Sequence, residues 1–206
     1  MQNNYTYDVA MFRDTFETRF TYLNGFMRNV SRFKTRPAMT DPLSGRRWTY
    51  EELNIEANRL AHALRASGVG KNDVVMFTLL NSPEFVFCYL AAHKVGAIAC
   101  PVNYRQGAGE IALVIDDSCP KAFLYDAEFG ELSAGALDMC QHKPGVVVMV
   151  DYKGGAQVPK GHILYKDYVS GQSEDDPPVD FHPHIYDETT RLPLDWAVWM
   201  AILFGL

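Results

Sequence analysis

Short apolar runs alternate with longer amphipathic segments between residues 74 and 150, and this alternation limits the fold more than any other feature of the chain. The runs have the length of buried strands, while the intervening segments have the three-to-four residue spacing of helices. Consecutive strands that are joined by helices run parallel, because a parallel pair needs a crossover connection. The sequence therefore predicts an α/β fold, a mostly parallel, doubly wound sheet with flanking helices. The expected strands are residues 74–80, 97–101, 121–125 and 146–150.

The first helix of the region has the clearest boundaries. Thr49 can accept a hydrogen bond at the helix start while Glu52 reaches back to the chain, which is a capping box. Gly68 follows the last apolar position and can take the left-handed conformation that ends a helix. We expect further helices from Ser82 and Pro83 to near Gly96, over residues 110–117, and, with a weaker signal, after Ala127.

The segments before residue 50 predict a helix and a hairpin. Residues 7–33 carry aromatic and aliphatic side chains at three-to-four residue steps, which favours a helix. Residues 37–49 hold the turn sequence DPLSG between two short apolar pieces, which is typical of a hairpin.

After Asp151, glycines and prolines indicate a loop-rich region with one short helix candidate over residues 163–169. The acidic run Glu174, Asp175 and Asp176 has two interpretations, a site for a hard cation or a solvated loop. We interpret it as a solvated loop and assign it no metal.

The charge of the chain argues against two classes of partner. The formal net charge is −6 and the pI is near 5.5. A chain of this kind has no cationic surface for nucleic acid or for an anionic membrane. We therefore expect no nucleic-acid partner.

The cysteines and the apolar segments indicate the compartment. Four widely spaced cysteines form neither a Cys-x-x-Cys pair nor a disulfide pattern. Residues 1–10 lack the apolar core of a secretory signal, and no segment approaches the roughly 20 apolar residues that span a bilayer. We expect a cytoplasmic protein with no membrane span. The cysteines are Cys88, Cys100, Cys119 and Cys140.

Several short blocks, in order, resemble one enzyme family. The sequences WTYEELN at residues 48–54, NRLA at residues 58–61 and LRASGV at residues 64–69 are similar to the first block of the AMP-forming acyl-CoA synthetases. NSPEF at residues 81–85 and KVGAIACPVNYR at residues 94–105 resemble the second block. The resemblance covers residues 37–125 well, weakens through residue 150 and returns faintly at residues 186–192. Asp117, Ser118 and Lys121 match the segment that follows in the same family.

The resemblance implies a two-step reaction. A carboxylate attacks the α-phosphate of ATP to give an acyl-adenylate and pyrophosphate, and the thiol of CoA then displaces AMP. The full-length family therefore uses a carboxylic acid, ATP, Mg²⁺ and CoA. The resemblance places the residues that line the acyl pocket mostly beyond Leu206, so these motifs name no acyl substrate.

One element that the resemblance requires is absent from the sequence. Relatives place a loop rich in glycine, serine and threonine, ending in lysine, directly after a strand like residues 186–192, but here Pro193 to Trp196 follow. Such a loop surrounds the developing phosphate charge with donors. We therefore carry over no catalytic, cofactor-binding or metal-binding residue, expect no bound cofactor, and expect the chain alone to be inactive. The nearest glycine-rich sequence, residues 107–109, is interpreted as a flexible start to the next helix.

Five polar residues are weaker candidates for a functional role. Arg105 follows a predicted strand, where an arginine can face a ligand cleft, but an ion pair or a surface role is the alternative that we prefer. His93 and His142 lack a serine or cysteine partner in sequence for general-base chemistry. His182 and His184 lack a third metal ligand, and we interpret them as solvated loop residues.

The chain divides into three parts by sequence. We expect a helical segment at residues 1–36, a partial AMP-binding domain at residues 37–192 and an atypical apolar tail at residues 193–206. One hypothesis for the tail is a truncated or frame-shifted gene, and the other is a genuine short product whose tail packs on the sheet. We predict the N-terminal part of a carboxylate–CoA ligase. The alternative is a non-catalytic binding or assembly module that forms an oligomer or pairs with a complementing chain.

Overall fold

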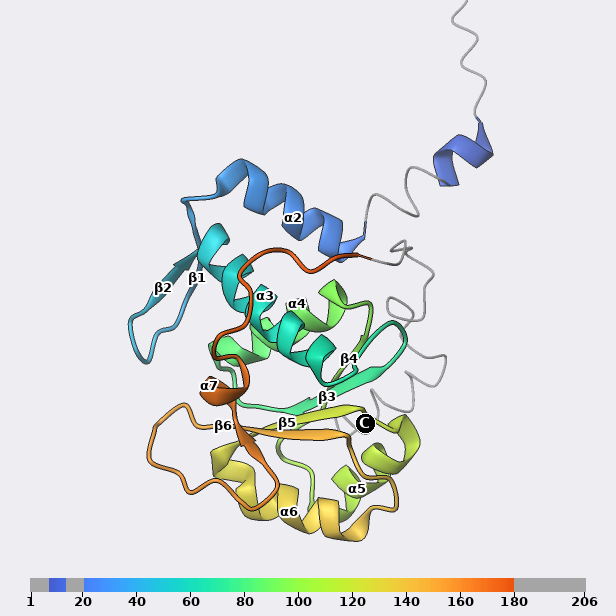
Figure 1. The fold of residues 1–206 in the computed structure, drawn as a ribbon, viewed down its shortest axis with the longest axis vertical. Helices are drawn as coiled ribbons and strands as arrows, with labels where there is room; N and C mark the ends of the chain where they lie inside the picture. Colours follow the sequence, from blue (N-terminus) through green and yellow to red (C-terminus); the bar gives the residue numbers. More distant parts are fainter. Residues whose placement is uncertain (1–7, 14–20, 180–206) are drawn as a thin grey trace, which may run out of the picture.

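A five-stranded parallel sheet forms the middle layer of this computed structural model, which describes residues 8–13 and 21–179 (Figure 1). The strand order is β4-β3-β5-β6-β7, so the chain first steps to one side of β3 and then crosses over to the other side. This is a doubly wound order, and it confirms the predicted α/β class. The strands are β3 (Val74–Thr78), β4 (Ile98–Pro101), β5 (Ala122–Asp126), β6 (Val146–Val150) and β7 (Ile163–Leu164).

Helices cover both faces of the sheet because its strands are apolar on both sides. Along β3, Val75 and Phe77 face one core and Met76 faces the other, as the two-residue period of a strand requires. The helices α3 and α4 lie on the first face, and α5 and α6 lie on the second (Figure 1). The helices are α2 (Tyr22–Phe33), α3 (Tyr50–Ala66), α4 (Pro83–Lys94), α5 (Ala108–Ser118), α6 (Gly130–Met139), which follows a single 3₁₀ turn (Ala127–Phe129), and α7 (Tyr165–Tyr168).

The boundaries of α3 confirm the expected capping. The Thr49 hydroxyl accepts a hydrogen bond from the Glu52 amide at 3.2 Å, and the Glu52 carboxylate accepts one from the Thr49 amide at 2.8 Å. Gly68 has a φ of +82°, and the amide of Val69 donates to the carbonyl of Leu64 at 3.0 Å. These bonds form a Schellman motif, in which a left-handed glycine ends the helix.

The helix α5 begins without a serine or threonine cap, as its sequence indicates. The Glu110 carboxylate accepts a hydrogen bond from the amide of Gly107 at 2.7 Å. One half of a capping box is therefore present, and the helix starts at Ala108. Gly107 and Ala108 thus form a helix start.

The predicted hairpin is present beside α3. Its strands, β1 (Pro37–Thr40) and β2 (Arg47–Thr49), pair antiparallel with an irregularity between Pro37 and Met39. The DPLSG turn connects them, with Gly45 at a φ of +71°.

The structure differs from the expectation near the C-terminal end of the described region. Residues 163–169 form a two-residue strand, β7, followed by the short helix α7, where a single short helix was predicted. The backbone of Ile163 and Leu164 pairs with β6, a contact that a run of two residues cannot reveal in sequence. Part of the predicted helix at residues 7–33, together with His182, His184 and the tail, lies outside the described residues.

Candidate functional site at the carboxyl edge of the sheet

A cavity of about 460 Å³ lies at the carboxyl ends of the central strands. Parallel strands end at the same edge of a sheet, and doubly wound proteins bind their ligands there, where the strand order reverses. In this chain the order reverses at β3, and the cavity is bordered by the segments that follow β3, β5 and β6. These segments contribute Leu80, Asn81 and Ser82, then Asp126, Ala127 and Glu128, then residues 151–154 and Ala156, while Leu43 comes from the hairpin turn.

Two aspartates at this edge arrange the backbone that lines the cavity. Asp126 ends β5, is almost fully buried, and accepts a hydrogen bond from the amide of Glu128 at 3.0 Å. Asp151 follows β6 and accepts hydrogen bonds from the amides of Gly154 at 2.9 Å and Ala156 at 2.8 Å. Side chains that bind their own backbone two or more residues ahead are typical of tight turns. Each aspartate therefore turns the chain sharply at the end of its strand.

The cavity carries an excess of negative charge. Burial raises the pKa of Asp126, although the Glu128 amide opposes that shift. Burial also raises the pKa of Glu84 in the first turn of α4, and the charges of Asp126 and Asp41 act in the same direction. Lys153 is the cation of the lining and forms an ion pair with Glu128. Three carboxylates and one ammonium therefore line the cavity, and the ammonium is already paired with one of the carboxylates.

The hairpin turn is fixed over the cavity by Asp41. This buried carboxylate accepts hydrogen bonds from the hydroxyls of Ser44 and Tyr152, and also from the amide of Leu43 at 3.0 Å. The Ser44 hydroxyl, and after it the Tyr152 hydroxyl, lowers the pKa of Asp41 to about 2. Because Leu43 and Tyr152 both line the cavity, Asp41 holds two of its walls together.

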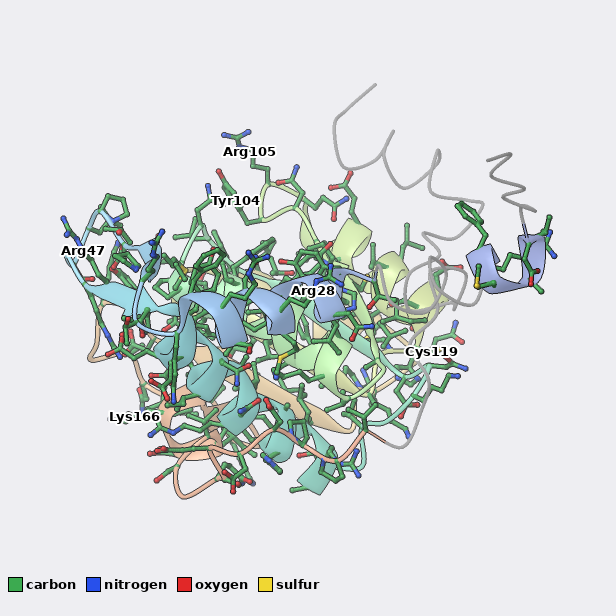
Figure 2. All side chains as sticks on the ribbon, turned by 90° about the horizontal axis from the view of Figure 1, so that it is seen from above. Arg28, Arg47, Tyr104, Arg105, Cys119 and Lys166 are labelled. Carbon is green, nitrogen blue, oxygen red and sulfur yellow. The ribbon has the colours of Figure 1, made fainter. Side chains whose placement is uncertain are left out.

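Arg105 lies apart from the cavity lining. Its side chain is exposed and its guanidinium lies 5.4 Å from the centre of the Tyr104 ring. Tyr104 stacks in turn on Phe129, with ring centres 5.4 Å apart. Figure 2 shows Arg105 and Tyr104 projecting from the periphery of the molecule. The structure therefore gives Arg105 a surface position on an aromatic pair, the kind of role that the sequence analysis preferred.

The histidines make contacts that do not suit a general base. His93 lies between the rings of Tyr22 and Tyr89, at 5.5 and 5.7 Å, and burial lowers its pKa. The ring of His142 lies 3.0 Å from the carbonyl oxygen of Pro120. His162, which the sequence analysis did not single out, lies 2.6 Å from the hydroxyl of Tyr125, whose pKa burial raises to about 12.

Two of the four cysteines, Cys88 and Cys100, are held in an environment that disfavours a nucleophilic thiolate. All four are free thiols, and burial raises the pKa of Cys88 and of Cys100. A thiol with a raised pKa is held in its unreactive protonated form. Figure 2 places the exposed Cys119 at the edge of the molecule.

The acidic run at residues 174–176 is an exposed loop, as expected, and two of its carboxylates also form ion pairs. Asp176 pairs with the buried Lys94 at 2.8 Å, and Glu174 pairs with Arg59. No local pattern signals these contacts, since the partners lie 82 or more positions away. Asp126 and Asp151 were missed in the same way, although an aspartate directly after a predicted strand is a signal that could have found them.

A doubly wound sheet with a cavity at its carboxyl edge is the architecture in which α/β proteins bind ligands. A family described as AMP-binding enzyme matches residues 26–184. The 3-hydroxybenzoate–CoA/4-hydroxybenzoate–CoA ligase of Thauera aromatica is 37% identical over 125 residues, which cover 61% of this chain and 23% of that ligase. The 3-hydroxybenzoate–CoA ligase of Aromatoleum sp. (strain CIB) is 35% identical over 147 residues, covering 69% and 27%.

A solved structure of the same family has a similar fold. A fatty acyl CoA synthetase of Mycobacterium tuberculosis superposes with a TM-score of 0.65 at 26% identity, covering 80% of this chain and 31% of that one. The chain belongs to the AMP-binding enzymes, the family of AMP-forming acyl-CoA synthetases. It spans about a quarter of the length of the two curated ligases. No helix within residues 8–13 and 21–179 is long and apolar enough to cross a bilayer.

Proposed function

We propose that the chain supplies the first portion of the adenylate-forming domain of an ATP-dependent, AMP-forming carboxylate–CoA ligase. The observation that carries the proposal is the placement of the family blocks on consecutive elements of one doubly wound sheet. The first block forms α3 and its caps, and the second runs from the start of α4 through β4. The blocks therefore build the fold in the order in which relatives use them.

We also propose that these 206 residues alone do not form an acyl-adenylate. Attack of a carboxylate on the α-phosphate of ATP needs hydrogen-bond donors around the developing phosphate charge. The sequence holds no glycine-rich loop ending in lysine that provides these donors. The cavity at the carboxyl edge is acidic and does not replace that loop. Among the described residues, no group of three or more His, Cys, Asp or Glu side chains is arranged to hold a metal ion.

Pyrophosphate exchange tests the inactivity of the chain. The purified chain is incubated with ATP, Mg²⁺, labelled pyrophosphate and one carboxylate at a time: 3-hydroxybenzoate, 4-hydroxybenzoate, 4-coumarate or a long-chain fatty acid. These acids are those that the relatives are named for. We expect no label in ATP above the reaction without protein. Label incorporated in the absence of any second protein would show that the phosphate contacts come from this chain.

A chimera tests whether this segment can serve as part of a working ligase, and its readout is the formation of product. Residues 26–184 replace the matching segment of the Thauera aromatica ligase, and hydroxybenzoyl-CoA formation is measured. We expect measurable activity, because the segment supplies the same sheet and helices. The matched control carries Leu60→Asp, which places a charge at a fully buried core position and should abolish activity. A chimera that folds but is as inactive as this control would contradict the proposal.

The reaction to which the chain contributes is proposed to take place in the cytoplasm. The free cysteines support this compartment, since disulfides form in oxidising ones.

A further inference from the structure

Residues 173–178, which we call the strap, lie along α3 without regular secondary structure. Figure 1 shows the chain running from α7 past α3 to the end of the described region at Val179. Within the described residues, no main-chain hydrogen bond joins the strap to another segment. Its attachment therefore depends on side chains.

Four of the side chains of α3 that hold the strap form one stripe, and Arg59 beside it pairs with Glu174. Positions 54, 58, 62 and 65 recur at three or four residue steps, so they share a face of the helix. Three of them bind main-chain carbonyls of the strap, and the fourth binds a carboxylate. The contacts are Asn58 Nδ2 to Glu174 O at 2.6 Å, His62 Nε2 to Asp175 O at 2.9 Å, Arg65 to Pro178 O at 3.1 Å, and Asn54 Nδ2 to Asp176 Oδ1 at 3.0 Å.

The ion pair between Lys94 and Asp176 differs from these contacts because its two partners are unequally buried. The side chain of Lys94 is 3% exposed and that of Asp176 is 52% exposed. The Lys94 ammonium lies 2.8 Å from Asp176 and 3.4 Å from the Met27 sulfur, which is a weak acceptor. A buried ammonium without a carboxylate is strongly unfavourable. Lys94 therefore depends on Asp176 much more than Asp176 depends on Lys94.

We propose that the strap opens and closes over Lys94 as one unit, and that the Lys94–Asp176 ion pair is the latch that keeps it closed. Opening the strap hydrates both charges, whereas closing it buries the ammonium against its carboxylate. Gly171, with a φ of +71°, provides a turn directly before the strap, and Pro177 is its one buried residue. The inference does not use the proposed enzymatic function.

Limited proteolysis of the 206-residue chain tests the latch. Subtilisin is added under native conditions, and cuts within residues 171–179 are timed by mass spectrometry. Each rate is divided by the rate for the same variant in urea, which removes effects of sequence on the protease. When opening is fast, the cleavage rate reports the population of the open form. Asp176→Asn should raise the normalised rate roughly tenfold or more, because an open strap lets water reach the unpaired Lys94.

Two further variants make the test specific. Asp175→Asn is the matched control, since Asp175 contacts α3 through its main-chain carbonyl, and its rate should stay within about twofold of the unchanged chain. Lys94→Met in the Asp176→Asn background should return the rate most of the way to the starting value, because a buried thioether needs no carboxylate. Cuts within the fully buried strand β5 report global unfolding.

Each outcome decides the matter. The latch is supported if Asp176→Asn accelerates strap cuts alone and Lys94→Met reverses the effect. It is overturned if Asp176→Asn leaves the strap rate unchanged, if Lys94→Met gives no rescue, or if Asp175→Asn has the same effect. Equal acceleration of cuts within β5 would show that the strap does not open separately, and would also overturn the proposal.

Discussion

At the scale of single residues, Asp41 makes the stability of the chain depend on pH. Its pKa is about 2 in the folded protein, below the ordinary value of 3.8, because two hydroxyls donate to it. A carboxyl whose pKa is lower when folded stabilises the fold above its unfolded pKa. That contribution is lost as the pH falls from about 3.8 towards about 2.

Asp41→Asn should therefore lower the melting temperature at neutral pH and remove part of the loss seen on acidification. Thermal unfolding followed between about pH 2 and about pH 7 measures both effects. Asp138→Asn, at an exposed position of α6, is the matched control and should leave the pH profile unchanged. Identical profiles for Asp41→Asn and the unchanged chain would contradict the assignment.

Local residue roles could be predicted from the sequence, and long-range ones could not. The helix caps at Thr49, Glu52 and Gly68 involve neighbours within a few positions, so their pattern can be recognised in the sequence. The partner of Asp41, Tyr152, lies 111 positions away, and the partner of Lys94 lies 82 positions away. Nothing in the spacing of a single sequence encodes such distances. For the same reason the cavity lining, which joins four separate segments, was not foreseen.

At the scale of elements, two glycines should respond in opposite ways to alanine. Gly68 ends α3 with a φ of +82°, and a Cβ there meets nothing within 4 Å, so Gly68→Ala should cost only backbone strain, about 1 to 2 kcal/mol. Gly109 lies within α5 with no left-handed φ and equal space, so Gly109→Ala should stabilise the fold by up to about 1 kcal/mol. Urea unfolding measures both. A destabilising Gly109→Ala would show that the start of α5 needs the freedom of glycine.

The elements with strong periodicity were predicted well. The strands β3 to β6 and the helices α3 to α5 lie within a few residues of their expected positions, because each buries a continuous apolar run or face. The strand β7 has two residues and exists only through its pairing with β6. Residue propensity and hydrophobic periodicity carry no signal over two residues, so β7 was missed.

At the scale of the whole molecule, the sheet separates two cores that we expect to unfold in one transition. Leu60 belongs to the core under α3 and α4, and Ile111 belongs to the core under α5 and α6; both are fully buried. Leu60→Ala and Ile111→Ala should each cost about 2 to 5 kcal/mol. Their effects should add to within about 0.5 kcal/mol, because no side chain is shared between the two sites.

Urea denaturation of the two single variants and the double variant checks this expectation. The transitions followed by tryptophan fluorescence and by circular dichroism should coincide in every variant, as they do for one cooperative unit. Separate transitions in either single variant would show that the faces of the sheet unfold independently.

The overall architecture could be predicted because alternation of strands and helices is a property of the whole chain. Local errors do not disturb it, and the family blocks agree with it. The strap could not be predicted, since its position is set by single polar contacts to α3 and α4.

The strand order also has a consequence for biosynthesis. After β4, every new strand is added to the same side of the sheet, and β5, β6 and β7 each pair with the strand laid down just before them on that side. Within the described residues, the growing sheet therefore keeps the outer edge of β4 unpaired and adds each later strand at its other edge. That other edge stays uncovered longest at β3, because its partner β5 begins only at Ala122. Pauses in translation between residues 101 and 122 would prolong this exposure, and chaperone capture should concentrate there.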